Sequence, residues 1–129
     1  MSIETLIIKQ ARLSDLRRDL KSEGCDEASK CTRLTKDSLN GFDFTSGDSC
    51  IAEVYRCWKD DCAEAGFNHC SDPHFEDVWE ISVDEGDVCQ HCKNVRNLKR
   101  QRMQAGREIG GVRAAITRAG RRLAKEAAA

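Results

Sequence analysis

The cysteines are the residues best able to do chemistry here, because the chain holds eight of them in 129 residues. Two lie in the segment Cys89-Gln90-His91-Cys92. A spacing of two residues lets both sulfurs reach one tetrahedral ion at about 2.3 Å, the distance typical of zinc. We therefore predict that Cys89 and Cys92 bind Zn²⁺ at the start of a helix, where free amides and the helix dipole stabilise thiolates.

A closed zinc site needs two more ligands. Cys57 and Cys62 are predicted to supply them, with 26 residues between the two pairs, in an arrangement that resembles a treble clef. A continuous helix over residues 48–65 would turn these two thiols toward different faces. In that case Cys62 with Cys70, or Cys70 with His74, are the alternative ligands.

Three other cysteines, Cys25, Cys31 and Cys50, offer a second metal site. Their spacing is irregular, and free cysteines are commonly small buried hydrophobic residues. Cys89 and Cys92 have the same alternative, two buried thiols without metal. A redox role for that pair has little support, because no βαβ pattern surrounds it.

The sequence contains no recognised catalytic set: it has no phosphate-binding glycine loop, no H-E-x-x-H and no nucleophile elbow. A zinc ion with four protein ligands also leaves no coordination position open for catalysis. We therefore predict a binding protein and not an enzyme.

Charge divides sharply after Cys92. Residues 93–129 carry eleven lysines and arginines against two glutamates, a net charge of +9, whereas residues 1–92 carry −10. Such a basic segment is typical of contact with a polyanion, so we expect it to bind nucleic acid or a nucleoprotein. An acidic protein surface and a merely solvated helix face are the alternatives. The predicted contact residues are Arg100, Arg107, Arg113, Arg118, Arg121 and Arg122.

The amino-terminal segment does not resemble a secretory signal, because residues 1–9 hold only a short apolar cluster. No apolar run approaches the roughly 20 residues that span a bilayer. We expect a cytoplasmic protein without membrane contact, in which thiols stay reduced.

Apolar spacing predicts the elements that position these residues. Leu6, Leu13, Leu16 and Leu20 mark one face of a helix that reaches about Ser22 and ends at Gly24. The polar stretch 25–49 is expected to be a loop with a short helix near 29–39. Residues 48–65 favour a helix over a strand. Residues 78–83 are expected to form a short strand that ends in a turn at 84–86.

After Cys92 the apolar residues alternate steps of three and four, interrupted once by Arg102. So narrow a stripe is typical of a coiled-coil seam, and the amino-terminal helix is its predicted partner. A homodimer is the alternative, with Arg102 as a buried charge. The apolar positions are Val95, Leu98, Ala105, Ile109, Val112, Ile116, Ala119 and Leu123.

Together these patterns predict a mainly α, zinc-stabilised single domain of 129 residues. It comprises an amino-terminal helix (1–23), an acidic cysteine-rich part with a treble-clef-like zinc knuckle (24–92), and a long basic helix (93–126) that packs on the first helix.

The segment 89–123, with CQHC, VRNLKRQR and GREIGGVRAAITRAGRRLA, resembles the carboxyl end of small zinc-finger-like proteins of bacteriophages and prophages. The resemblance covers about a quarter of the chain. It implies expression in a bacterial cytoplasm and an accessory role, in regulation or in interference with host machinery or defence. The alternative function is therefore an inhibitor or adaptor that binds a host protein.

Overall fold

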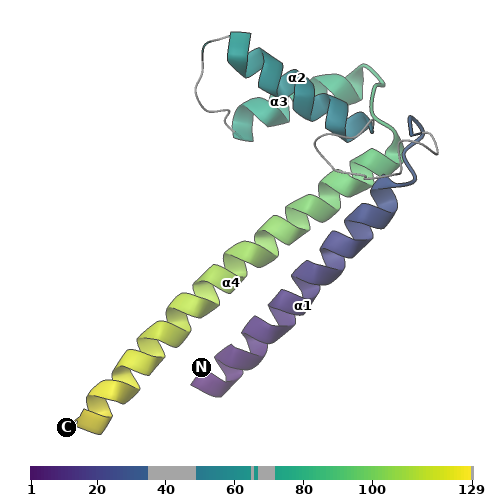
Figure 1. Cartoon of the computed structure of the whole chain (residues 1–129). Helices are drawn as coiled ribbons and strands as arrows, with labels where there is room; N and C mark the ends of the chain where they lie inside the picture. Colours follow the sequence, from purple (N-terminus) through teal and green to yellow (C-terminus); the bar gives the residue numbers. More distant parts are fainter. Residues whose placement is uncertain (35–48, 65, 67–71, 129) are drawn as a thin grey trace. The chain divides into compact units, whose positions relative to one another are not determined.

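The computed structural model describes residues 1–34, 49–64, 66 and 72–128, and these are mainly helical, as predicted. Four helices follow one another along the chain (Figure 1): α1 (Ile3–Ala28), α2 (Cys50–Glu64), α3 (Asp72–Asp84) and α4 (Gln90–Ala128). No strand occurs in these described ranges. The chain divides into two compact units, a helix pair formed by Met1–Glu23 with Leu98–Ala129, and a second unit formed by Gly24–Asn97.

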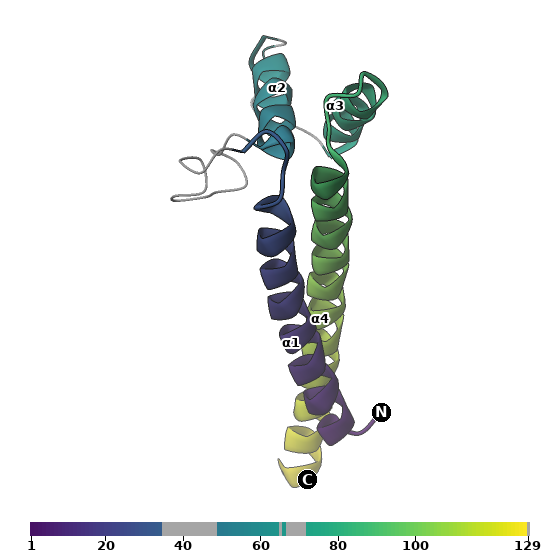
Figure 2. The ribbon, with the colours of Figure 1, turned by 90° about the vertical axis from the view of Figure 1, so that its right-hand side faces the viewer.

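In the helix pair, α1 and α4 run antiparallel and side by side (Figures 1 and 2), which confirms the predicted packing of the two terminal helices. Leu6 and Leu13 of α1 pack against Ile109 and Val112 of α4, and this row of contacts is called the seam below. The apolar pattern on α4 therefore faces another helix, as a coiled-coil stripe should. Leu16, which was predicted to share the apolar face of α1, is 47% exposed.

The first helix begins where expected but ends later. The hydroxyl of Ser2 accepts a hydrogen bond from the amide of Thr5, at 3.2 Å, and so caps the amino terminus. The predicted end at Gly24 is wrong, because α1 continues to Ala28. A glycine inside a helix costs only about 1 kcal/mol, and burial of Ala28 in the Gly24–Asn97 unit helps to offset that cost.

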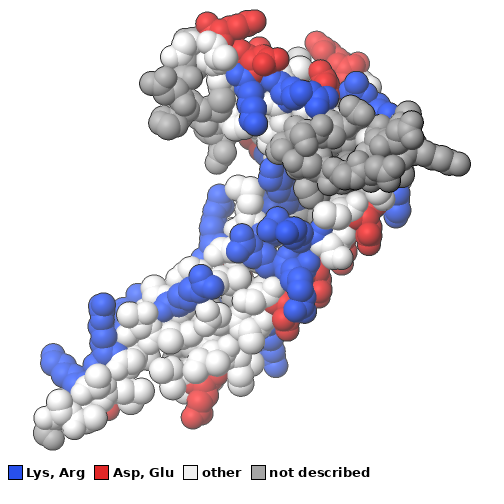
Figure 3. All heavy atoms as spheres, viewed as in Figure 1, with Lys and Arg blue, Asp and Glu red and all other residues white. Residues whose placement is uncertain are grey.

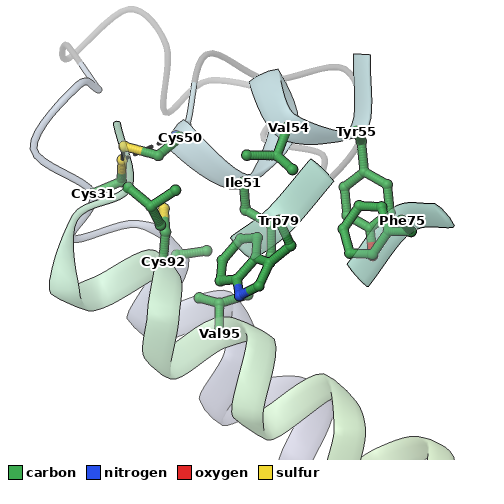
Figure 4. Close-up of a cluster of buried hydrophobic side chains, with 11 residues drawn as sticks. Cys31, Cys50, Ile51, Val54, Tyr55, Phe75, Trp79, Cys92 and Val95 are labelled. Carbon is green, nitrogen blue, oxygen red and sulfur yellow. Dashed lines mark hydrogen bonds between the residues drawn. The ribbon is translucent and has the colours of Figure 1, made fainter. Parts of the chain in front are cut away.

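The Gly24–Asn97 unit has its own core between α2, α3 and the start of α4 (Figure 4). Ile51 and Val95 are almost fully buried there. The rings of Tyr55 and Phe75 stack with centroids 4.7 Å apart, and the ring of Trp79 lies 6.4 Å from that of Phe75. This core fixes α2 and α3 against the first turns of α4.

The segment predicted as a strand at residues 78–83 is part of helix α3. Trp79, Ile81 and Val83 alternate as in a strand, but the core uses Phe75, Val78 and Trp79, which share one face of a helix. Ile81 is 57% exposed. The predicted turn at 84–86 is confirmed: Gly86 has a positive φ of 77°, and the amide of Asp87 closes a Schellman cap onto Ser82.

The helix predicted over 48–65 is confirmed as α2, and the buried hydroxyl of Ser49 caps it by accepting from the amide of Ala52. Of the short helix expected near 29–39, residues 29–34 form turns, and residues 35–39 lie outside the described ranges.

Candidate metal centre

Four cysteines from distant parts of the sequence meet in the Gly24–Asn97 unit. The sulfurs of Cys31, Cys50, Cys89 and Cys92 all lie within 4.8 Å of one another. The sulfur of Cys31 is 3.5 Å from that of Cys50, as Figure 4 marks, and 3.7 Å from that of Cys89. A disulfide would require about 2.05 Å, so these are separate thiols. Such a set could hold a metal ion.

Local structure positions each of the four thiols. Cys31 lies in the turns that follow α1, and Cys50 is the first residue of α2. Cys89 directly precedes α4, and Cys92 lies in its first turn. The amino termini of α2 and α4 therefore both lie at the cluster, and their partial positive charges favour thiolates there.

Backbone amides add to this effect by donating to the sulfurs. The amide of Cys50 donates to the sulfur of Cys31 at 3.4 Å, and that of Cys92 donates to the sulfur of Cys89 at 3.5 Å. The backbone amides of Thr32 and Ile51 also act to lower the pKa of Cys89 and Cys92, respectively. Because a donated hydrogen bond favours the ionised form, the backbone is arranged for negatively charged sulfur.

The ionisation of the cluster is uneven. Burial opposes ionisation of Cys89, but the amides of Cys92 and Thr32 outweigh burial and lower the pKa of Cys89 to about 6. Burial raises the pKa of Cys92 well above its usual range, and burial also raises that of Cys50. Without a cation, these shifts favour a thiolate at Cys89 and protonated thiols at Cys50 and Cys92 near neutral pH. A bound metal ion would displace those protons.

A polar network holds the start of α4 against the end of α1. The carboxylate of Glu27 accepts from the side-chain amide of Asn94 at 2.9 Å and contacts the ring nitrogen Nδ1 of His91 at 2.7 Å. These hydrogen bonds lower the pKa of Glu27. His91 lies between the two cysteines of the C-x-x-C segment, so the network orients the segment that carries Cys89 and Cys92.

The structure brings together only part of the predicted ligand set. Cys89 and Cys92 lie in the cluster, but Cys57 and Cys62 do not. The reason is the continuous helix α2, which exposes Cys57 and buries Cys62. The thiol of Cys57 has a raised pKa because of burial and the nearby carboxylates of Glu53 and two aspartates, Asp61 and Asp60.

The remaining ligand candidates do not enlarge the cluster. Cys62 is disulfide-bonded, so it has no free thiol to bind a metal, and the expectation that every thiol stays reduced does not hold for this residue. The alternative ligand His74 lies outside the four-cysteine group. The other alternative, Cys70, lies outside the described residues.

Cys31 and Cys50 are the members that the ligand prediction for this site missed. Both were considered only for a second site, together with Cys25, which is a free thiol outside the cluster. A usable signal was present at Cys50. It follows Ser49, a residue type favoured as a helix cap, and so lies at a helix amino terminus as Cys92 does.

The six arginines predicted to contact a partner are all exposed on α4, but they do not form one row. At 3.6 residues per turn, Arg100, Arg107, Arg118 and Arg122 share one face of the helix, opposite the seam. That set is called the basic face below. Arg121 lies beside it, whereas Arg113 is turned toward the seam and lines a hollow there with residues of α1. Figure 3 shows basic side chains gathered over the helix pair.

No protein-family model matches the chain, and neither a comparison with curated proteins nor one with solved structures finds a similar protein. The chemistry of the site is therefore inferred from the residues of this chain alone. Among the described helices, none is long and apolar enough to cross a bilayer.

Proposed function

We propose that this protein is a non-catalytic zinc-binding protein that binds nucleic acid through the basic face of α4. Zinc bound by Cys31, Cys50, Cys89 and Cys92 would hold the Gly24–Asn97 unit together. In keeping with the resemblance of segment 89–123, its setting would be a bacterial cytoplasm and its role that of a phage accessory protein.

The spacing of the sulfurs supports zinc. Four thiolates at about 2.3 Å from a tetrahedral ion lie about 3.8 Å from one another. The pairs Cys31–Cys50 and Cys31–Cys89, at 3.5 and 3.7 Å, are already close to this value. Soft thiolate ligands in a closed set of four favour zinc over the hard cations Mg²⁺ and Ca²⁺.

The observation that carries the nucleic-acid proposal is the arrangement of the basic face. Its four arginines are exposed and lie opposite the seam, so a ligand could reach all of them without disturbing the packing against α1. Of the acidic residues of α4, Glu108 lies on a different side of the helix, and Glu126 lies one turn beyond Arg122, after the last arginine of the row. A row of exposed cations without interspersed carboxylates can follow phosphates and release their counterions.

Salt dependence of duplex DNA binding tests this proposal. Four neutralised phosphates predict a slope of log affinity against log salt of about −3 to −4, and hence a loss of about a hundredfold between 50 and 200 mM. Reversal of two charges, Arg118→Glu with Arg122→Glu, should make the slope less negative by about two. Fluorescence anisotropy with a labelled duplex measures both effects.

The matched control is the double variant Lys9→Glu with Arg12→Glu, which changes the net charge equally on exposed positions of α1. It should leave the slope nearly unchanged. If both double variants reduced the salt dependence of duplex binding equally, the effect would come from net charge in general. That result would contradict the assignment of the basic face. Absence of duplex binding at 50 mM salt would reject nucleic acid and favour the host-protein alternative.

A further inference from the structure

A hollow of about 280 Å³ opens along the seam of the helix pair, and its lining is unusually cationic. Apolar surface is scarce there, because only Ile109 contributes a large apolar side chain. The lining residues are Ser14, Arg17, Arg18, Arg102, Ile109 and Arg113.

Two of these arginines occupy positions where a seam normally places apolar residues. Arg17 lies four residues after Leu13 and three before Leu20. Arg102 has the same spacing on α4, between Leu98 and Ala105. A Cβ added at Gly106 of α4 would lie 3.7 Å from Nε and Cζ of Arg17, which is ordinary van der Waals contact. The guanidinium of Arg17 therefore reaches across to α4.

Most of this positive charge has no counter-charge among the residues that the structure describes. Arg18 pairs with Asp15 at 3.3 Å and lies 3.9 Å from a carboxylate oxygen of Asp19. Within the described residues, no carboxylate pairs with Arg17, Arg102 or Arg113.

Arg102 is the least satisfied of the group. Its Nε is buried and has no hydrogen-bond acceptor in the described part of the chain, a state that is costly for a polar group. The positive field extends to Lys99, whose pKa is lowered by burial and by the charge of Arg102. The helix pair is thus held together around cations that repel one another.

We propose that this hollow is a binding site for one phosphate group, held by Arg17, Arg102 and Arg113 with the hydroxyl of Ser14 as a further donor. Guanidinium groups present paired donors that match phosphate oxygens, and hydrogen bonds between charged partners are the strong ones. A water molecule takes about 30 Å³ in the liquid, so the hollow has room for a phosphate and ordered water.

This site is separate from the basic face, because it lies at the seam and joins both helices. It does not depend on nucleic-acid binding, since the phosphate could belong to a nucleic-acid backbone or to a free phosphate or phosphate ester. In either case the bound anion would neutralise the repulsion between Arg17 and Arg102 and so stabilise the helix pair.

Inorganic phosphate added to the full-length protein tests the site through its effect on thermal stability. We expect the melting temperature to rise more in phosphate than in sodium chloride of equal ionic strength. Arg102→Gln and Arg17→Gln should each weaken phosphate binding by about tenfold or more. In the absence of phosphate, these variants should be at least as stable as the original protein, because each removes a repelling charge.

The matched control is Arg12→Gln, an exposed arginine of α1 that does not line the hollow. It should keep the full response to phosphate. A response no larger than that to chloride, or one equally reduced in Arg12→Gln, would overturn the proposed site.

Duplex DNA binding by Arg102→Gln then identifies the source of the phosphate. If the duplex supplies it, this variant loses duplex affinity and inorganic phosphate competes with the duplex. If free phosphate is the ligand, the variant keeps its duplex affinity while losing the thermal response. Both outcomes support the site, and neither depends on the arginines of the basic face.

Discussion

The helix pair and the Gly24–Asn97 unit bury their side chains to different depths. In the Gly24–Asn97 unit, Ile51 and Cys92 have no exposed surface at all, whereas Leu13 in the seam remains 8% exposed. The seam is one row of residues along two long helices, and arginines interrupt it. The other unit has short helices packed around aromatic rings and four thiols. The comparison shows that the helix pair is stabilised by apolar residues repeated along two helices. The Gly24–Asn97 unit is stabilised by side chains from several segments that meet in one core.

Removal of metal should have the largest effect, and it should affect the two units unequally. Structural zinc contributes about 10–16 kcal/mol in small zinc domains. We expect a chelator, or Cys92→Ser, to unfold α2 and α3. The seam should persist in part, since it has its own apolar contacts, but it should weaken because Gly24–Asn97 would become a long flexible connection. Hydrogen exchange followed by mass spectrometry measures protection helix by helix.

Equal loss of protection in α2, α3 and the outer halves of α1 and α4 would contradict this prediction, since it would show that one cooperative unit depends on the metal. Cys57→Ser provides the control, because Cys57 is an exposed cysteine outside the cluster.

A cavity in the seam should have an intermediate effect. Leu13→Ala removes a buried side chain that packs with Ile109, and such changes cost about 2–3 kcal/mol. Leu16→Ala, three residues away on the exposed side of α1, should cost less than about 0.5 kcal/mol. Urea denaturation monitored by circular dichroism gives both values. Similar costs for the two variants would mean that the seam is not where the helices pack.

The smallest effect is expected at Glu27, and it depends on pH. Its pKa in the folded protein is lowered by hydrogen bonds from Asn94 and His91. The carboxylate therefore contributes stability at neutral pH, and that contribution is lost as the pH falls through and below the usual carboxyl range. Glu27→Gln should lower the melting temperature slightly at pH 7 and hardly at all at pH 3. If the difference in melting temperature between Glu27→Gln and the original protein stayed constant from pH 7 to pH 3, the ionised carboxylate of Glu27 would not contribute to stability.

Repetitive features of the fold could be predicted from the sequence because each follows from local spacing. The alternation of three and four steps in α4 predicted its seam, and C-x-x-C at the start of that helix predicted two of the four clustered thiols. Phe75 shows where such reasoning failed. Trp79, Ile81 and Val83 by themselves resemble a strand, whereas Phe75, Val78 and Trp79 mark one face of a helix.

Cys31 and Cys50, the other two cysteines of the cluster, were harder to predict. The spacing of residues in the sequence does not show which distant segments meet in the folded chain. Cys31 and Cys50 are 19 residues apart, and they meet only because the turns after α1 and the start of α2 come together in space. The spacing of Cys57 and Cys62 looked more typical of a ligand pair, but both lie on the continuous helix α2, which exposes one and buries the other. Which cysteines meet is decided by packing between elements, which a one-dimensional pattern does not contain.

Titration with Co²⁺, a coloured substitute for zinc, tests the four-thiolate site most directly. We predict one equivalent bound per chain, with the intense visible bands of tetrahedral cobalt and the ultraviolet absorption of thiolate ligands. Cys31→Ser and Cys50→Ser should each weaken the spectrum, while Cys57→Ser should leave it unchanged. A folded protein that binds no cobalt, or one whose spectrum is lost in Cys57→Ser and kept in Cys31→Ser, would contradict this assignment.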